Sequence, residues 1–118
     1  MLDQLTILAP GLLGASVARA ARERGVAKRI VIWARRAEVR LQLVSQPWCD
    51  DAPATLEAAV KDAKFVVIAA PVTRITSLVQ AIVSHLPAGA IVTDIGSVKG
   101  EVSRLGHAAM IPQGHFIG

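Results

Sequence analysis

The 118-residue chain has one cysteine, no tyrosine and only four other aromatic residues. The single cysteine, Cys49, excludes an internal disulfide, and no cysteine and histidine residues have the spacing of a metal site. The tryptophans and phenylalanines are scattered through apolar runs, so they form no platform on which bases would stack. These absences argue against a disulfide-bonded domain, a metal site and a nucleic acid partner, and they suit a reducing cytoplasm.

No segment has the composition of a membrane span or a targeting sequence. Residues 75–93 lack charged side chains, but they contain a glutamine, a histidine, a proline and a glycine. A span needs about 20 predominantly apolar residues, so this segment fits a helix, a turn and a strand better. The apolar run 5–20 is interrupted by Pro10-Gly11 and follows Asp3, where a signal peptide has basic residues. We expect no membrane association and a cytoplasmic location.

Positive charge is concentrated in the first third of the chain. The net charge is +4, and residues 1–40 carry eight basic and three acidic residues whereas the remainder carries five and six. This distribution favours an anionic ligand bound near the N-terminal part. The length suits one domain and is too short for a cofactor domain together with a full substrate domain.

Short apolar runs alternate with segments of helical periodicity, which is typical of a parallel sheet with crossover helices on both faces. We expect Gly25 to end the first helix with a positive φ and Thr55 to cap the third helix through its hydroxyl. The predicted fold class is α/β, a single doubly wound Rossmann-like domain with a mainly parallel sheet. Predicted strands cover residues 5–8, 29–33, 65–69, 90–94 and 115–117, and predicted helices cover 12–24, 37–45, 56–61, 75–85 and 99–108.

A doubly wound sheet binds its ligand at the carboxyl ends of the strands, near the point where strand order reverses. Four segments follow predicted strands and contain small or polar residues in place of core residues: 9–13, 34–36, 70–73 and 95–99. We expect these four segments to meet at one edge of the sheet.

The first of these segments has fewer glycines than a usual phosphate-binding turn. In the pattern G-x-G-x-x-G, the chain retains Gly11 and Gly14 but has Ala9 in the first position. The middle glycine lets a pyrophosphate approach the backbone, and the last lets helix and strand pack closely. Pro10 removes a backbone donor, which we expect to weaken phosphate binding. The alternative is an ordinary strand-to-helix turn.

The second predicted strand ends without the carboxylate that an NAD site uses to bind the ribose. Ala34, Arg35 and Arg36 stand there instead. Nothing at these positions repels a 2′-phosphate, and a guanidinium can pair with it through charge-assisted hydrogen bonds. Since such a bond contributes about 1.5–3 kcal/mol, we predict NADP to be preferred over NAD by about 10- to 100-fold. The alternative is that both arginines are solvated charges at the start of a helix.

Residues 93–101 place small, hydroxyl, acidic and basic residues at one strand-to-helix junction. Gly96 permits close approach to the backbone, and Ser97 is positioned to cap the next helix. Lys99 opposes the dipole of that helix, which indicates an anionic partner. A plain cap and a surface charge remain the alternative.

With these motifs the chain resembles the nucleotide-binding domain of prephenate and arogenate dehydrogenases. The resemblance covers nearly all 118 residues, and its most specific part is Asp94-Ile95-Gly96-Ser97-Val98-Lys99. It implies oxidative decarboxylation in tyrosine biosynthesis, in which a ring carbon gives hydride to a nicotinamide and carbon dioxide is lost. The other matching segments are Gly11 to Ser16, Val67 to Val72 and Phe116 to Gly118.

The resemblance also implies roles for individual residues. The pyrophosphate would contact the turn and the start of the first helix, and Arg35 and Arg36 would bind the adenosine ribose. Ser97 would lie nearest the reacting groups, as the catalytic residue. The remaining cofactor-binding residues would be Gly11, Leu12, Leu13, Gly14, Ala70, Pro71, Val72 and Gly96.

Two parts of the family's catalytic machinery are not matched in this sequence. In the family a histidine follows the strand that ends in Phe116-Ile117-Gly118, and a helical domain completes the substrate pocket and forms a dimer. His107 and His115 are not substitutes, because one is in a predicted helix and the other enters a strand. We expect residues 1–118 to bind cofactor, to be inactive alone and to belong to a homodimer when full-length. The alternatives are another NADP-dependent hydroxyacid or imine dehydrogenase and a non-catalytic nucleotide sensor.

Overall fold

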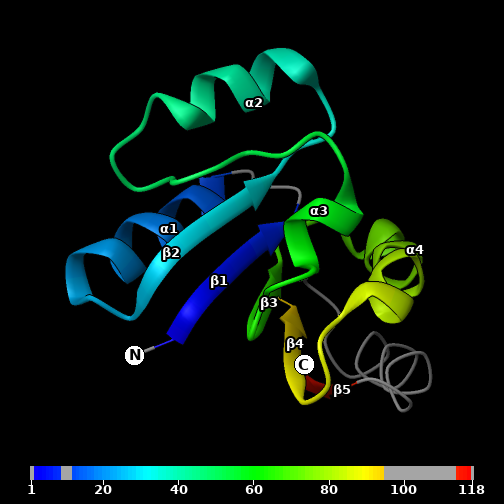
Figure 1. The fold of residues 1–118 in the computed structure, drawn as a ribbon. Helices are drawn as coiled ribbons and strands as arrows, with labels where there is room; N and C mark the ends of the chain where they lie inside the picture. The colour runs from blue at the N-terminus through cyan, green and yellow to red at the C-terminus, as the bar shows by residue number, and fades with distance from the viewer. Residues whose placement is uncertain (1, 9–11, 95–113, 118) are drawn as a thin grey trace.

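The computed structural model describes residues 2–8, 12–94 and 114–117, and in them a five-stranded sheet has the order β2-β1-β3-β4-β5. Every neighbouring pair of strands is parallel, and Figure 1 shows helices on both faces of the sheet. This arrangement confirms the predicted doubly wound α/β fold. The strands are β1 (Leu2–Leu8), β2 (Ala27–Trp33), β3 (Phe65–Ile68), β4 (Ala90–Asp94) and β5 (Gly114–Ile117). The helices are α1 (Leu12–Arg24), α2 (Ala37–Val44), α3 (Leu56–Val60), α4 (Val72–Ile82) and the 3₁₀ turn η1 (Val83–His85).

Three elements begin at least two residues earlier than the sequence predicts. The strand β1 begins at Leu2 and β2 at Ala27, because these two residues are paired in the sheet ahead of the apolar runs, although Asp3 and Lys28, which follow them, are exposed and polar. The helix α4 begins at Val72, before the expected Ile75. The low helix propensity of its β-branched first residues is outweighed by four buried side chains, Ile75, Leu78, Val79 and Ile82. The predicted helix 99–108 lies outside the described residues.

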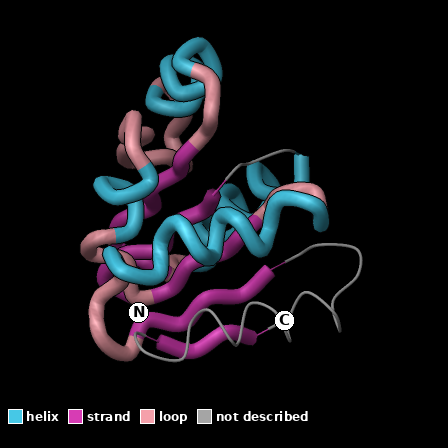
Figure 2. The backbone as a smooth tube through the Cα atoms, turned by 90° about the vertical axis from the view of Figure 1, so that its right-hand side faces the viewer, coloured by secondary structure: helices cyan, strands magenta, loops and turns pink. Residues whose placement is uncertain are grey.

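The two faces of the sheet carry separate apolar clusters. Ile7, Ile32 and Val67 lie on the face covered by α1, where they pack with Ala18 and Ala21 of that helix. The other face of the sheet packs against α3 and α4 through residues of β2, β3 and β4, among them Val31, Val66, Ile68 and Val92. Figure 2 shows the strands between the helices from a second direction. Burial on both faces explains why these strands are apolar throughout.

Two local predictions are confirmed. Gly25 has φ 64° directly after α1, a conformation that glycine adopts at low cost. The hydroxyl of Thr55 accepts a hydrogen bond of 3.1 Å from the amide of Ala58 at the start of α3.

Two polar side chains are buried in the interior strand β1. The hydroxyl of Thr6 donates to the carbonyl oxygen of Ala59 in α3 at 2.8 Å, and the Gln4 amide donates to the same oxygen at 3.2 Å. The Gln4 amide also lies 3.1 Å from the Thr6 hydroxyl oxygen. These hydrogen bonds satisfy the buried polar groups and fix α3 against the sheet.

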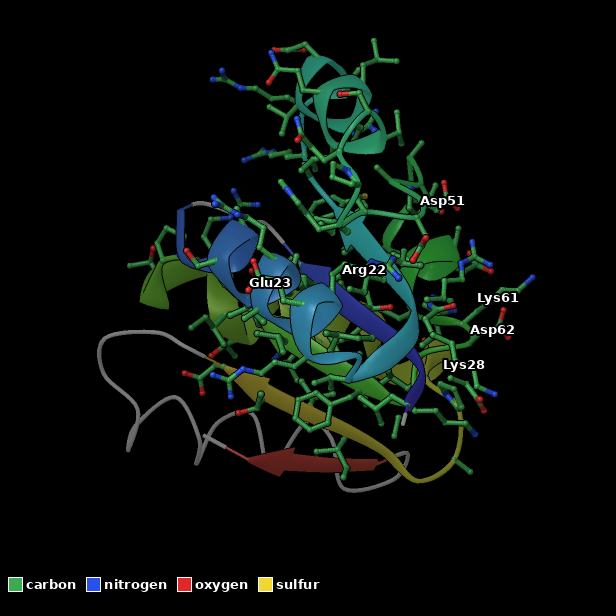
Figure 3. All side chains as sticks on the ribbon, turned by 90° about the vertical axis from the view of Figure 1, so that its left-hand side faces the viewer. Arg22, Glu23, Lys28, Asp51, Lys61 and Asp62 are labelled. Atoms are coloured by element: carbon green, nitrogen blue, oxygen red, sulfur yellow. The ribbon has the colours of Figure 1, made fainter. Side chains whose placement is uncertain are left out.

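Residues 49–51 form no regular strand, but they run along the outer edge of β2 as the segment beside β2. The amide of Asp50 donates to the Ile30 carbonyl at 2.8 Å, and the amide of Ile32 donates to the Asp51 carbonyl at 3.0 Å. A carboxylate oxygen of Asp50 accepts from the Ile30 amide at 2.7 Å and pairs with Arg22 of α1. Asp51 forms an ion pair with Arg29, with 3.1 Å between their charged atoms. In Figure 3, Asp51 is labelled in this segment and Arg22, the partner of Asp50, is labelled on α1. The segment therefore covers backbone groups that an edge strand otherwise exposes.

Candidate cofactor-binding site

The carboxyl ends of four strands lie in one row across the sheet. Leu8 of β1 is paired with Trp33 of β2 and with Ile68 of β3, and Ile68 is paired with Asp94 of β4. The chain leaves β1 in one direction to reach β2 and later returns to β3 on its other side, so strand order reverses between β1 and β3. The four segments after these strands therefore start from one edge, at the place where doubly wound folds bind ligands.

The first turn of α1 combines a buried glycine with an absence of acidic side chains. Gly14 is buried, and no acidic residue occurs in the first turn of α1. Gly14, Ala18 and Ala21 are spaced four and three residues apart, so they form one small-residue stripe by which α1 approaches the sheet. Backbone amides at a helix start favour an anion. Ala9, Pro10 and Gly11 lie outside the described residues, and Leu12 and Leu13 begin the helix.

Arg35 and Arg36 follow β2 and are both exposed. Among the residues that the structure describes, neither guanidinium has a carboxylate within 4.0 Å. Arg36 is the residue before α2, with an extended backbone (φ −92°, ψ 136°) and no side-chain cap. Both side chains therefore remain available to an anion at the carboxyl edge.

A third arginine, Arg40, holds the backbone of this loop. Its Nη1 donates to the carbonyl oxygen of Ala34 at 2.8 Å and to that of Arg35 at 3.0 Å. Arg40 is half-buried, and Ala34 is buried. Arg40 was not among the predicted site residues. The sequence does contain a signal for it, because Arg40 is a basic residue in the helix that directly follows the loop after β2.

The segment after β3 also leads straight into a helix. Ala70 is buried, Pro71 is exposed with φ −56° and ψ 145°, and α4 starts at Val72. The carbonyl of Pro71 accepts from the amide of Arg74 at 2.8 Å. No acidic residue occurs in the first turn of α4. A second helix N-terminus therefore lies at the carboxyl edge, beside β1.

Asp94 ends β4 with 1% of its surface exposed. The residues that follow it, including Gly96, Ser97 and Lys99, lie outside the described residues. The predicted catalytic residue Ser97 and the predicted cofactor-binding residue Gly96 are therefore not placed, like Gly11 before α1.

Cys49 is buried in the segment beside β2, and its thiol donates to the carbonyl oxygen of Asp51 at 3.3 Å. Burial raises the pKa of this thiol above its ordinary value of 9.0, and the nearby carboxylates of Asp50 and Asp51 raise it further. Hydrogen bonding to the backbone partly opposes these effects. The thiol is therefore protonated at neutral pH and is a poor nucleophile.

The pH dependence of stability should report this thiol. Because its folded pKa is raised, the folded state holds the proton more tightly, and stability falls as pH rises from about 9.0 through the folded pKa. We expect the free energy of unfolding in urea to fall more steeply between pH 8 and pH 10 for the natural chain than for Cys49→Ala. Identical slopes for the two proteins would show that Cys49 ionises equally in both states.

The described part of the chain has neither a cluster of metal ligands nor a long apolar helix. No group of three or more His, Cys, Asp or Glu side chains among those residues is arranged to hold a metal ion. No helix within residues 2–8, 12–94 and 114–117 is long and apolar enough to cross a membrane.

The strand order and the helices on both faces define a doubly wound α/β domain of the Rossmann-like class. The sequence model described as "Prephenate dehydrogenase, nucleotide-binding domain" matches residues 17–118. The chain therefore belongs to this family, as its sequence motifs predicted. No curated protein sequence matches it.

Solved structures of the same fold include several dehydrogenases. Prephenate dehydrogenase from Aquifex aeolicus, solved with hydroxyphenyl propionate and NAD+, has a TM-score of 0.86 at 22% identity, over 97% of this chain and 40% of that chain. Synechocystis arogenate dehydrogenase has a TM-score of 0.83 at 26% identity, over 90% and 37%. A putative prephenate dehydrogenase from Corynebacterium glutamicum has a TM-score of 0.78 at 28% identity, over 95% and 35%. This chain thus spans about two fifths of the length of these proteins.

Proposed function

We propose that this chain is the NADP-binding domain of a prephenate or arogenate dehydrogenase. Family membership supports the dehydrogenase class. The preference for NADP rests on one observation, the exposed pair Arg35 and Arg36 after β2, with no carboxylate within 4.0 Å among the described residues. The Aquifex aeolicus structure contains NAD+. At 22% identity it supports only the fold of this chain, so the proposed cofactor rests on Arg35 and Arg36.

The residues at the carboxyl edge suit the parts of such a cofactor. The start of α1 would hold the pyrophosphate through Gly11, Leu12, Leu13 and Gly14, since no acidic side chain opposes it there. Arg35 and Arg36 would pair with the 2′-phosphate of the ribose. Ala70, Pro71 and Val72 would lie on the adenine side, with Gly96 permitting close approach to the backbone. When bound, NADP would supply the hydride acceptor.

The reaction of the whole protein would be oxidative decarboxylation of prephenate or arogenate in tyrosine biosynthesis, with Ser97 nearest the reacting groups. Hydride transfer needs a positioned substrate and a base. Because this chain covers only 37–40% of the first two neighbours, we propose that it binds cofactor without turning over substrate by itself. The full-length enzyme would be a cytoplasmic homodimer without nucleic acid or membrane partners.

Calorimetric titration of the 118-residue chain with NADP and with NAD tests the proposal. We expect NADP to bind about 10- to 100-fold more tightly, the value of one charge-assisted contact to the 2′-phosphate. Equal affinities would contradict the assignment of Arg35 and Arg36. Failure of both to bind would contradict cofactor binding by this chain. Turnover of prephenate by the unextended chain would contradict its proposed inactivity.

A further inference from the structure

The loop between β2 and α2 has an anchor that is separate from its two exposed arginines. Nη1 of Arg40 lies 2.8 Å from the Ala34 carbonyl oxygen and 3.0 Å from the Arg35 carbonyl oxygen. One nitrogen thus donates to two consecutive carbonyls, at the point where the chain leaves the sheet. This pair of hydrogen bonds fixes the direction in which the backbone turns.

Among the described residues, the N-cap of α2 adds no second side-chain anchor to this loop. Arg36 occupies the N-cap position of α2, and its side chain makes no capping hydrogen bond. The amide of Arg40 donates to the Arg36 carbonyl at 3.1 Å, as in any first helical turn. The backbone of residues 34–36 is therefore held by β2 on one side and by the side chain and amide of Arg40 on the other.

The three arginines differ in what they do. Arg40 is half-buried, with its guanidinium used on backbone oxygens, while Arg35 and Arg36 are exposed. A loop fixed before a ligand arrives loses less conformational entropy on binding than a mobile one. Exposed arginines on a fixed backbone can therefore meet a 2′-phosphate at lower cost than the same side chains on a free loop.

We propose that Arg40 is a positioning residue for cofactor discrimination, which orders residues 34–36 so that Arg35 and Arg36 recognise the 2′-phosphate. This inference rests on the proposed preference for NADP. It assigns Arg40 no contact with the cofactor, so its effect should pass through the order of the loop.

The test combines cofactor titration with NMR relaxation of the free protein, using Arg40→Met. This variant keeps an apolar stem of similar length but removes the donors. We expect the backbone order parameters of residues 34–36 to fall from the range of about 0.85 for a rigid backbone. The NADP-to-NAD affinity ratio should fall about 10-fold, while NAD affinity changes less than about 2-fold.

The comparison with Arg35→Met separates positioning from contact. That variant should lower the affinity ratio while leaving the order of residues 34–36 unchanged, because Arg35 supplies only its carbonyl to the anchor. Lys64→Met is the control for removing one positive charge, since Lys64 is exposed at the amino end of β3, opposite the site. It should change neither measurement.

The affinity ratio and the order parameters of Arg40→Met together determine whether Arg40 positions the loop. A lower ratio with an unchanged order parameter would make Arg40 a direct ligand of the phosphate and overturn the positioning role. An unchanged ratio would overturn it as well. If Arg40→Met does not fold, Arg40→Lys retains a charged donor and should show an intermediate loss of both order and ratio; no loss of order would contradict the anchor. Absence of any NADP preference in the parent chain would identify the proposed function as the point of failure.

Discussion

Replacing Arg35 with aspartate should abolish the preference for NADP over NAD. The affinity ratio is expected to fall from about 10- to 100-fold to about one or below, because the substitution removes a charge-assisted pair and places a negative charge beside the 2′-phosphate. The new carboxylate also supplies the group that NAD sites use to bind the ribose 2′-hydroxyl. Calorimetric titration with both cofactors measures the ratio directly.

The design of this experiment follows from the exposure of Arg35. Exposed charges are screened by salt, so both cofactors must be titrated at one ionic strength. Lys64→Asp makes the same change in net charge at the opposite edge of the sheet and should leave the ratio unchanged. If both Arg35→Asp and Arg36→Asp keep the parental ratio, neither arginine recognises the 2′-phosphate.

The sheet was predictable because each strand can be recognised from the apolar character of its own residues. A strand buried on both faces must be apolar along its length, and residues 30–33 and 65–68 satisfy this condition without reference to the rest of the chain. The alternation of strands with helices then determines a parallel sheet. The carboxyl ends follow from that topology, which is why the four candidate segments were found to start from one row.

Element boundaries were less predictable, since they depend on backbone pairing more than on side chains. Gln4 is buried in β1 although it is polar, because Ala59 of α3 accepts its hydrogen bond from a position 55 residues away. The residues next to Gln4 in the sequence do not indicate that Ala59 accepts this hydrogen bond. The early start of α4 has the same origin, since packing of its buried face outweighs local propensity.

The anchor Arg40 and the segment beside β2 were missed for a related reason. Asp51 forms a single bridge with Val31, and a single bridge produces no periodic pattern in the sequence. The contacts of Arg40 are to backbone carbonyls, which any residue type provides. Both features become visible only when the backbone of β2 and its neighbours is placed.

Asp50→Ala should destabilise the domain by about 1–3 kcal/mol, the cost of leaving a buried donor without a partner. The donor is the amide of Ile30, which lies 2.7 Å from the Asp50 carboxylate in a residue with no exposed surface. The ion pair with Arg22 adds less, since the two side chains are 34% and 38% exposed and water screens their attraction. Urea unfolding of the variant and the parent measures the difference.

Asp50→Asn separates these two contributions, because it removes the charge but keeps an oxygen that can accept from the Ile30 amide. Its loss should be below about 1 kcal/mol, the range of an exposed ion pair. Asp62→Ala is the matched control, an exposed aspartate without an ion pair among the described residues. Equal losses for Asp50→Ala and Asp50→Asn would show that the ion pair dominates.

The stability of the domain and its choice of cofactor should respond to different substitutions. The Ile30 amide lies inside β2, and the cofactor loop begins only at Ala34. Asp50→Ala should therefore leave the NADP-to-NAD affinity ratio of the folded protein unchanged, whereas Arg35→Asp should change that ratio with little effect on the free energy of unfolding.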